Sequence, residues 1–190
     1  TVALSHGQCI TITQIPDGAT YAVSETPNDG YKVVVEGDTD SNLVAEGEIQ
    51  TNQTAEADFT NIKLSQFSFT KVAAEDHTQA LPSAEFQVFS LQCTNDGHDH
   101  SKDLIDPDSP GGCWTYLGTW TSDDEGAVAF GGLQPSSQYQ LVETKAPGGR
   151  VLPAGQWRIT TDENNRLKVE EVLSGTQRPP AFVLDSATGN

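Results

Sequence analysis

The stretch from Tyr139 to Pro147 reads Tyr-Gln-Leu-Val-Glu-Thr-Lys-Ala-Pro, and it constrains the fold more than any other part of the chain. Side chains alternate between the two faces of a β-strand, so Tyr139, Leu141 and Glu143 would share one face. The first two belong in an apolar core, whereas Glu143 is a carboxylic acid, which is costly to bury unless it is paired or protonated. Either Glu143 lies at the open edge of a sheet or it has a role inside, and we favour the role inside.

The same pattern occurs earlier in the chain. Tyr21 and Glu25 stand at the same spacing as Tyr139 and Glu143, an aliphatic residue precedes each tyrosine by six positions, and Thr follows each glutamate. Such a repeat is typical of two related β units, in which Glu25 and Glu143 would occupy equivalent places. The alternative is a chance similarity between two hairpins.

Alternating patterns and turn residues predict strands throughout, and no segment shows a sustained helical period. The junction from Lys63 to Gln66 contains neither Gly nor Pro, which favours two domains joined end to end. We therefore expect an all-β chain of two tandem immunoglobulin-like β-sandwiches, residues 1–63 and 64–190, with the first incomplete at its N-terminus. The expected strands are 9–15, 21–25, 31–36, 43–50, 55–61, 67–72, 84–93, 113–120, 127–130, 139–143, 156–161, 167–173 and 179–185.

Acidic side chains dominate the charge of the chain. The 27 Asp and Glu residues against 10 Lys and Arg residues give a net charge of −17 and a pI near 4.3. This argues against nucleic acid or an anionic membrane surface as a partner. No apolar run in this sequence approaches the length of a membrane span, and we expect no signal peptide within residues 1–190. The charge is typical of a solvated, surface-exposed protein.

Two of the three cysteines bracket a loop rich in Asp, Gly, Pro and Ser. Cys93 and Cys113 each lie beside a predicted strand, so we expect them to form a disulfide. Closing that loop would contribute about 3 kcal/mol in the chain-entropy model, and it implies an oxidising, extracellular setting. Cys9 is left over, either as a buried thiol or with a partner upstream of Thr1.

A lysine at the start of the second unit would face the same core as Glu143. Phe67, Phe69 and Lys71 share one strand parity, so the Lys71 amine would point toward the core. Desolvation lowers the pKa of a lysine and raises that of a glutamate, so both groups can be neutral at pH 7. A neutral amine can attack an Asn side-chain amide and leave an isopeptide bond, while the carboxylic acid shuttles protons. The alternative is an ordinary half-buried ion pair.

The string Phe-x-Phe-x-Lys at 67–71, followed by Tyr-x-Leu-Val-Glu-Thr-Lys-Ala-Pro at 139–147, resembles the CnaB-type domains of Gram-positive, sortase-assembled pilins and wall-anchored surface proteins. The resemblance covers residues 67–190 and implies that Lys71 is the isopeptide donor and Glu143, in the family's E-box, the promoting acid. Gly-Gln-Trp at 155–157 and Pro-Pro-Ala-Phe at 179–182 are similar to C-terminal domains of minor pilins.

The resemblance also implies an acceptor Asn or Asp on the last strand. In the second unit the candidates are Asp185 and Asn190, and the acceptor could equally lie beyond Asn190. Residues 1–62 more loosely resemble the second half of a pilin isopeptide domain, in which Glu25 would be the acid and Asn61 the acceptor. Its donor lysine should then lie upstream of Thr1.

The resemblance implies a structural subunit of an extracellular, cell-wall-anchored pilus, whose partners are other pilin subunits and sortase. Shaft, base and tip positions all stay open, and a minor, ancillary subunit is favoured. The isopeptide bond forms once per molecule, so this is not an enzyme with turnover, and no cofactor is indicated.

An adhesin or adhesin stalk is the alternative function. In that reading the acidic loop would contact a host glycan or matrix protein, together with Trp114, Tyr116 and Trp120 if these are exposed. The loop also holds a group that could be read as a metal site, although its spacing fits neither an EF-hand nor a zinc motif. We favour a solvated, disulfide-closed loop over a metal site. The residues of that group are His98, Asp99, His100, Asp103, Asp106 and Asp108.

Overall fold

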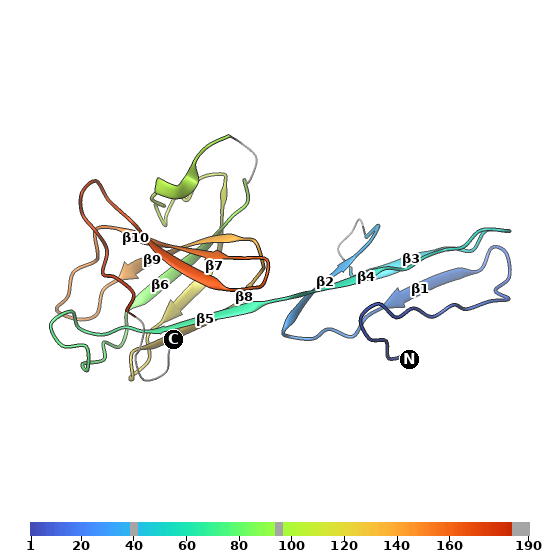
Figure 1. The fold of residues 1–190 in the computed structure, drawn as a ribbon, viewed down its shortest axis with the longest axis horizontal. Coiled ribbons are helices and arrows are strands. Elements are labelled where there is room, and N and C mark those ends of the chain that lie inside the picture. The colour runs from blue at the N-terminus through green and yellow to red at the C-terminus, as the bar shows by residue number, and fades with distance from the viewer. Residues whose placement is uncertain (39–41, 94–96, 184–190) are drawn as a thin grey trace. The chain divides into compact units, whose positions relative to one another are not determined.

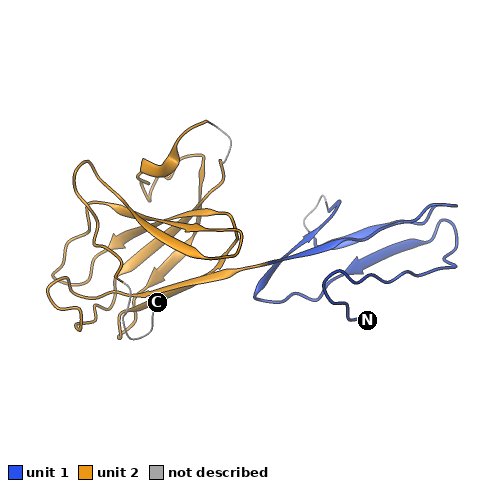
Figure 2. Cartoon of the chain, viewed as in Figure 1, with its two compact units in different colours: residues 1–62 blue, residues 63–190 orange. Residues whose placement is uncertain are grey.

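The computed structural model describes residues 1–38, 42–93 and 97–183, and it confirms the all-β class (Figure 1). The chain divides into two compact units, residues 1–62 and 63–190 (Figure 2). The regular elements of the described residues are eleven strands and one short 3-10 helix. They are β1 (Thr20–Ser24), β2 (Tyr31–Val35), β3 (Val44–Glu48), β4 (Phe59–Lys63), β5 (Ser65–Thr70), β6 (Glu85–Leu91), η1 (His100–Lys102), β7 (Trp114–Thr121), β8 (Ala127–Leu133), β9 (Gln138–Lys145), β10 (Gln156–Thr161) and β11 (Leu167–Val172).

The second unit contains a five-stranded antiparallel sheet in the order β11-β10-β9-β6-β7 and a two-stranded sheet of β5 and β8. The core gathers inward-facing residues from both sheets, as alternation along each strand requires. Phe69 of β5, for example, meets Phe86 of β6 edge to face at 5.0 Å. The buried members of this core are Phe67, Ala84, Phe86, Val88, Val128, Phe130, Leu133, Tyr139, Leu141, Trp157 and Ile159.

The other face of the five-stranded sheet is partly covered as well. Ile105, in the segment between β6 and β7, packs with Phe89, Trp114 and Val142 into a second buried cluster. Cys93 and Cys113 form the expected disulfide at the base of this segment. Consecutive residues of β9 are therefore buried, from Tyr139 to Glu143, because both faces of that strand are covered.

The C-terminal segment packs without forming the expected strand. The described part, Pro179 to Val183, is irregular, because prolines cannot donate hydrogen bonds to a sheet. The Trp157 indole N–H nevertheless donates to the Pro180 carbonyl at 2.7 Å. Phe182 lies 5.7 Å from Phe67 and 5.2 Å from Phe69, ring centroid to centroid. This part of the chain therefore lies beside β5.

The first unit holds two two-stranded sheets, β1 paired antiparallel with β3, and β2 paired with β4. Among its described residues only Val35 and Ala45 are buried. The strand expected at 9–15 is wrong: this segment is irregular, and Ile10 and Ile12 are exposed. Its alternating pattern did not suffice, because no described strand pairs with it. Cys9 is a free, exposed thiol, so the buried-thiol reading is wrong too.

Candidate lysine–glutamate site

Lys71 follows directly on β5, at a point where its backbone is fixed on both sides. Its N–H donates to the Gly126 carbonyl at 2.7 Å, and its carbonyl accepts from the Leu81 N–H at 2.9 Å. Gly126 has φ +77°, and a Cβ there would lie 2.5 Å from the Lys71 carbonyl oxygen. Only glycine fits this turn without strain, so the turn before β8 helps to fix where the lysine side chain starts.

Glu143 lies in β9, on the same face as Tyr139 and Leu141, as the parity of the sequence predicts. Its side chain is 1% exposed, and its Oε2 lies 2.7 Å from the Nζ of Lys71. Phe86 is its cross-strand neighbour on β6, and the Lys71 Nζ stands 5.8 Å from the centre of that ring. The two charged groups therefore meet beside the Phe86 ring at the core, where little water reaches them.

The second oxygen of Glu143 is the unusual feature of this pair. Oε1 is buried without a hydrogen-bond partner among the described residues. Burial raises the pKa of Glu143 above its ordinary value, although the hydrogen bond and charge of Lys71 oppose the rise. A carboxyl with a raised pKa and an unused oxygen is suited to exchange a proton with a third group.

Asp185 and Asn190, the acceptor candidates for this unit, lie outside the described residues. The described residues before them end at Val183, and the Phe182 ring packs on Phe67 and Phe69. Those two phenylalanines lie on β5, the strand that Lys71 directly follows.

In the first unit the structure brings Glu25 and Asn61 together. The Asn61 side-chain amide donates to the Glu25 Oε1 at 2.7 Å, across 36 residues of sequence. Both residues are exposed, and Glu25 lies one residue beyond β1. The environments of Glu25 and Glu143 are therefore not equivalent, contrary to expectation, because the described residues of the first unit form almost no core around Glu25.

The aromatic residues near the disulfide are mostly structural. Trp114 is buried, with the Arg158 guanidinium 4.8 Å from the centre of its ring. Trp120 packs against the main core, and only Tyr116 is exposed. The adhesin reading required exposed aromatics, so this observation weakens it.

Sequence reasoning missed a buried polar network on the second face of the sheet. The Arg158 Nε donates to the Gln140 Oε1 at 2.7 Å, and the Gln140 side-chain amide donates to the Gln156 Oε1 at 2.7 Å. Gln156 in turn exchanges hydrogen bonds with both backbone groups of Ile105. No sequence signal points to this network, since polar residues at these parities read as an ordinary solvent-facing side of the sheet.

Most of the second unit matches a known protein family. The profile of the SpaA prealbumin-like fold domain matches residues 65–172, more than half of the chain. The chain belongs to this SpaA family. A second profile, a domain of unknown function (DUF7601), matches residues 1–63. The matched SpaA domain holds Lys71, Glu143 and the disulfide.

A curated relative of this SpaA-family chain is the fimbrial subunit type 2 of Actinomyces naeslundii, 30% identical over 129 residues. The match covers 57% of this chain but only 23% of the fimbrial subunit. The resemblance to pilin-type surface proteins expected from the sequence is confirmed at this level.

Three solved structures are similar to this chain over part of their length. The Bacillus anthracis TIE protein is 22% identical over 82% of this chain and 22% of its own, with a TM-score of 0.36. A streptococcal ancillary pilin is 20% identical over 85% of this chain and 41% of its own, with a TM-score of 0.37. The major pilin RrgB of Streptococcus pneumoniae is 14% identical over 70% of this chain and 32% of its own, with a TM-score of 0.35. Separately, the described residues contain no helix that is long and apolar enough to cross a membrane.

Proposed function

We propose that this chain is part of a structural subunit of a Gram-positive cell-surface pilus, and that Lys71 forms an intramolecular isopeptide bond with Glu143 as the promoting acid. The observation that carries the proposal is the 2.7 Å contact between the Lys71 Nζ and a Glu143 carboxyl that is 1% exposed. The related fimbrial subunit supports the pilus part of the proposal. Because the chain spans 23% of that relative, assembly with other subunits, attachment by sortase to the wall and an ancillary position are proposals too.

The chemistry is an addition followed by an elimination at a side-chain carbonyl. Glu143 takes a proton from Lys71, and the neutral Nζ attacks the carbonyl carbon of an acceptor Asn or Asp. The new carbon–nitrogen bond forms as the carbon–nitrogen bond of Asn, or the carbon–oxygen bond of a protonated Asp, breaks. Glu143 passes this proton to the leaving group, which departs as ammonia or water. The attacking nitrogen gives up a second proton to become an amide N–H, and this proton leaves with ammonia as ammonium or passes to solvent. The acid ends unchanged, and the lysine is consumed once.

A bond at this place would resist a pulling force. Lys71 follows β5, the first strand of the second unit, and the described part of the C-terminal segment lies against that strand through Phe182. A covalent link from Lys71 to an acceptor such as Asp185 or Asn190 would tie the start of the unit to its end. Closing a loop of more than 100 residues contributes about 4–5 kcal/mol in the chain-entropy model.

The first unit supports a second, weaker part of the proposal. Glu25 and Asn61 are already hydrogen-bonded, which is the contact expected of a promoting acid and its acceptor amide. A donor lysine reaching this pair would complete the same chemistry. Glu25 is exposed, so packing by a further strand would be needed to shield its carboxylate from water.

The proposal is tested by the intact mass of the purified protein. Wild type should weigh one ammonia less than the sequence requires if the acceptor is Asn, or one water less if it is Asp. Glu143→Gln, which keeps the shape of the side chain, and Lys71→Arg should each restore the full mass expected for that variant.

The matched control is the exposed pair of Lys145 and Glu85, 2.6 Å apart, on the same sheet. Glu85→Gln should leave the mass deficit intact. Full unreacted mass in wild type, or a deficit that survives Glu143→Gln, would contradict the assigned role of this pair.

A further inference from the structure

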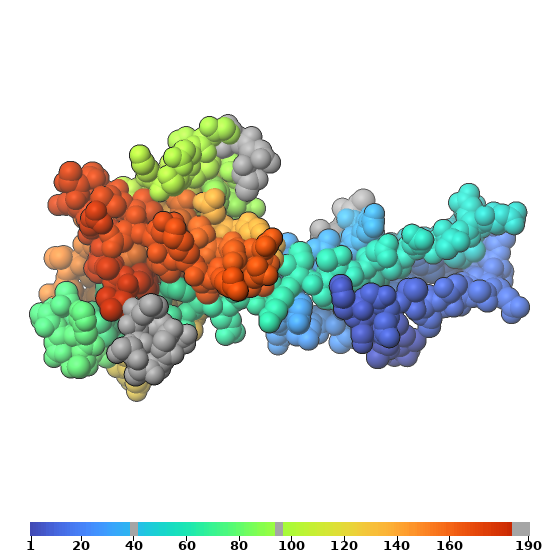
Figure 3. Space-filling view, in the orientation of Figure 1, coloured from blue at the N-terminus to red at the C-terminus, as the bar shows by residue number. Residues whose placement is uncertain are grey.

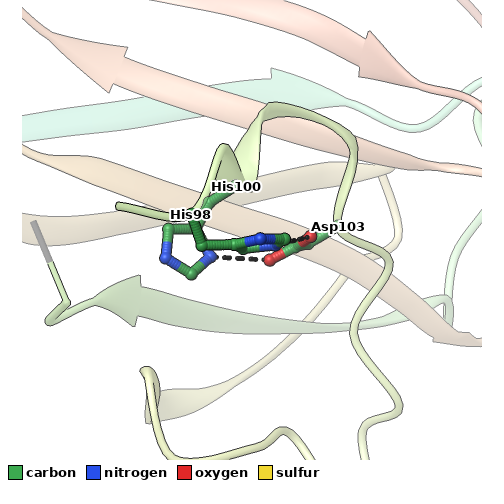
Figure 4. A group of neighbouring side chains, drawn as sticks. All are labelled: His98, His100 and Asp103. Carbon is green, nitrogen blue, oxygen red and sulfur yellow. Dashed lines mark hydrogen bonds and ion pairs between the residues drawn. The ribbon is translucent and has the colours of Figure 1, made fainter. Parts of the chain in front are cut away.

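Two histidines and an aspartate converge beside η1, in the segment closed by the disulfide (Figure 4). The His98 Nε2 lies 3.0 Å from one carboxylate oxygen of Asp103, and the His100 Nδ1 lies 2.6 Å from the other. One potential ligand atom from each residue lies within 4.8 Å of the other two. Figure 3 shows this segment in light green on the surface of the second unit.

We propose that His98, His100 and Asp103 form a binding site for a divalent transition-metal ion of the zinc class. Two imidazole nitrogens and one carboxylate oxygen are a donor set that such ions accept, with a further position left for water or a partner's ligand. Ligand atoms around tetrahedral zinc stand about 3.3–3.5 Å apart, given metal–ligand distances near 2.0–2.2 Å. The observed side chains would need to shift by only about an ångström to surround an ion.

The backbone of two of these ligands is held by buried side chains of the sheet. The Arg158 Nη2 donates to the carbonyl of His100 at 2.7 Å, and the Gln140 side-chain amide donates to the carbonyl of Asp103 at 2.9 Å. Arg158 and Gln140 are 4% and 0% exposed, and His100 itself is 9% exposed. Such support fixes ligand positions before an ion arrives and reduces the entropy lost on binding.

The site is open on one side. The His98 side chain is 60% exposed and that of Asp103 is 27% exposed. A pocket of about 460 Å³ borders the group, lined in part by His100, Asp103 and Trp114. An ion can therefore enter from solvent, and a fourth ligand has room.

Asp103 joins the two histidines, because each of its carboxylate oxygens lies within hydrogen-bond distance of one imidazole ring.

The neighbouring acids have local structural roles instead. Asp99 accepts from the Ser101 N–H at 3.0 Å, and Asp106 accepts from the Asp108 N–H at 3.0 Å. The loop therefore separates into acids that stabilise turns and one acid that faces two histidines. The sequence alone favoured a solvated loop, because the spacing matches no common metal motif and the convergence depends on the path of the chain.

The test is calorimetric titration of zinc chloride into the protein in a Cys9→Ser background, since the exposed Cys9 thiol could supply an unrelated ligand. We expect one saturable equivalent of zinc and an increase in melting temperature when zinc is added. His98→Ala removes an exposed ligand, so the metal-free melting temperature should stay unchanged while zinc affinity falls at least tenfold. Asp103→Asn should weaken binding similarly, whereas His77→Ala, at an exposed histidine outside the group, should not.

Cobalt gives a second readout, since Co²⁺ in such a site should show visible absorption bands that His98→Ala removes. Absence of saturable binding at millimolar zinc would overturn the proposal and leave the group as a hydrogen-bonded His–Asp cluster. Zinc binding that neither His98→Ala nor Asp103→Asn weakens would overturn it equally.

Discussion

The Lys71 Nζ and the Glu143 Oε2 lie 2.7 Å apart although 72 residues separate them in the sequence. The glutamate comes from β9 of the five-stranded sheet, and the lysine follows β5 of the two-stranded sheet. Burying an ion pair usually gains little stability over apolar packing. Its placement at the core, with the Glu143 Oε1 left without a partner among the described residues, supports a chemical role better than a stabilising one.

The pH dependence of a variant should reveal the environment of Glu143. In Lys71→Ala the cation that opposes the rise is gone, so the pKa of Glu143 should lie further above its ordinary value of about 4.5. The folded state would then bind the proton more tightly than the unfolded chain. The contribution of Glu143 to the stability of this variant should be greatest below pH 4.5, and it should be lost as the pH rises through the folded-state pKa of Glu143.

Urea unfolding of Lys71→Ala across this range measures the effect. Relative to Lys71→Ala/Glu143→Gln, which also cannot form the isopeptide bond, we expect a loss of about 3 kcal/mol at neutral pH because an unpaired charge is buried. The double variant Lys71→Ala/Glu143→Gln has no group to titrate there and should lack this component. Equal pH slopes for the single and double variants would show that Glu143 is not in a desolvated site.

Gly155→Ala should destabilise the contact between β10 and the C-terminal segment. A Cβ at this position would lie 2.4 Å from the Val172 carbonyl oxygen and 2.6 Å from the Pro179 Cδ. We expect a loss of about 1–3 kcal/mol in the free energy of unfolding, as for other overpacked sites. Gly148→Ala, where a Cβ meets nothing within 4 Å, should be nearly neutral. A neutral Gly155→Ala would mean that the segment does not pack on Gly155.

Removing the disulfide should destabilise the second unit. Cys93 and Cys113 are 20 residues apart, so Cys93→Ser/Cys113→Ser should cost about 3 kcal/mol in the chain-entropy model. Denaturant unfolding measures this loss, with Cys9→Ser as the control that should change little. Peptide mapping without reduction should recover the two cysteines linked, and two free thiols in native protein would refute the bond.

Strand parity carried much of the prediction from sequence. Placing Tyr139, Leu141 and Glu143 on one face, and Lys71 beside Phe69, was enough to bring the lysine and glutamate together, because both strands face one core. Strand parity gave a wrong prediction for residues 9–15. Ile10 and Ile12 alternate like strand residues, yet their segment is irregular, since a strand also needs a neighbour to satisfy its backbone.

The burial of polar residues on the second face of the sheet could not be predicted either, and the reason is different. Gln140 and Arg158 are buried only because the segment between β6 and β7 folds over them. The path of that segment depends on the disulfide and on packing of Ile105, which local patterns do not encode. The convergence of His98 and Asp103 depends on the same path.

Peptide-level mass spectrometry of the full-length mature protein tests the central claim most directly. After digestion with trypsin, the account predicts a branched peptide that joins the Lys71 side chain to an Asn or Asp of a terminal strand, and no cleavage after Lys71. Glu143→Gln should abolish the branched peptide and restore cleavage. Complete cleavage after Lys71 in wild type, with every Asn and Asp peptide at its unmodified mass, would contradict the account.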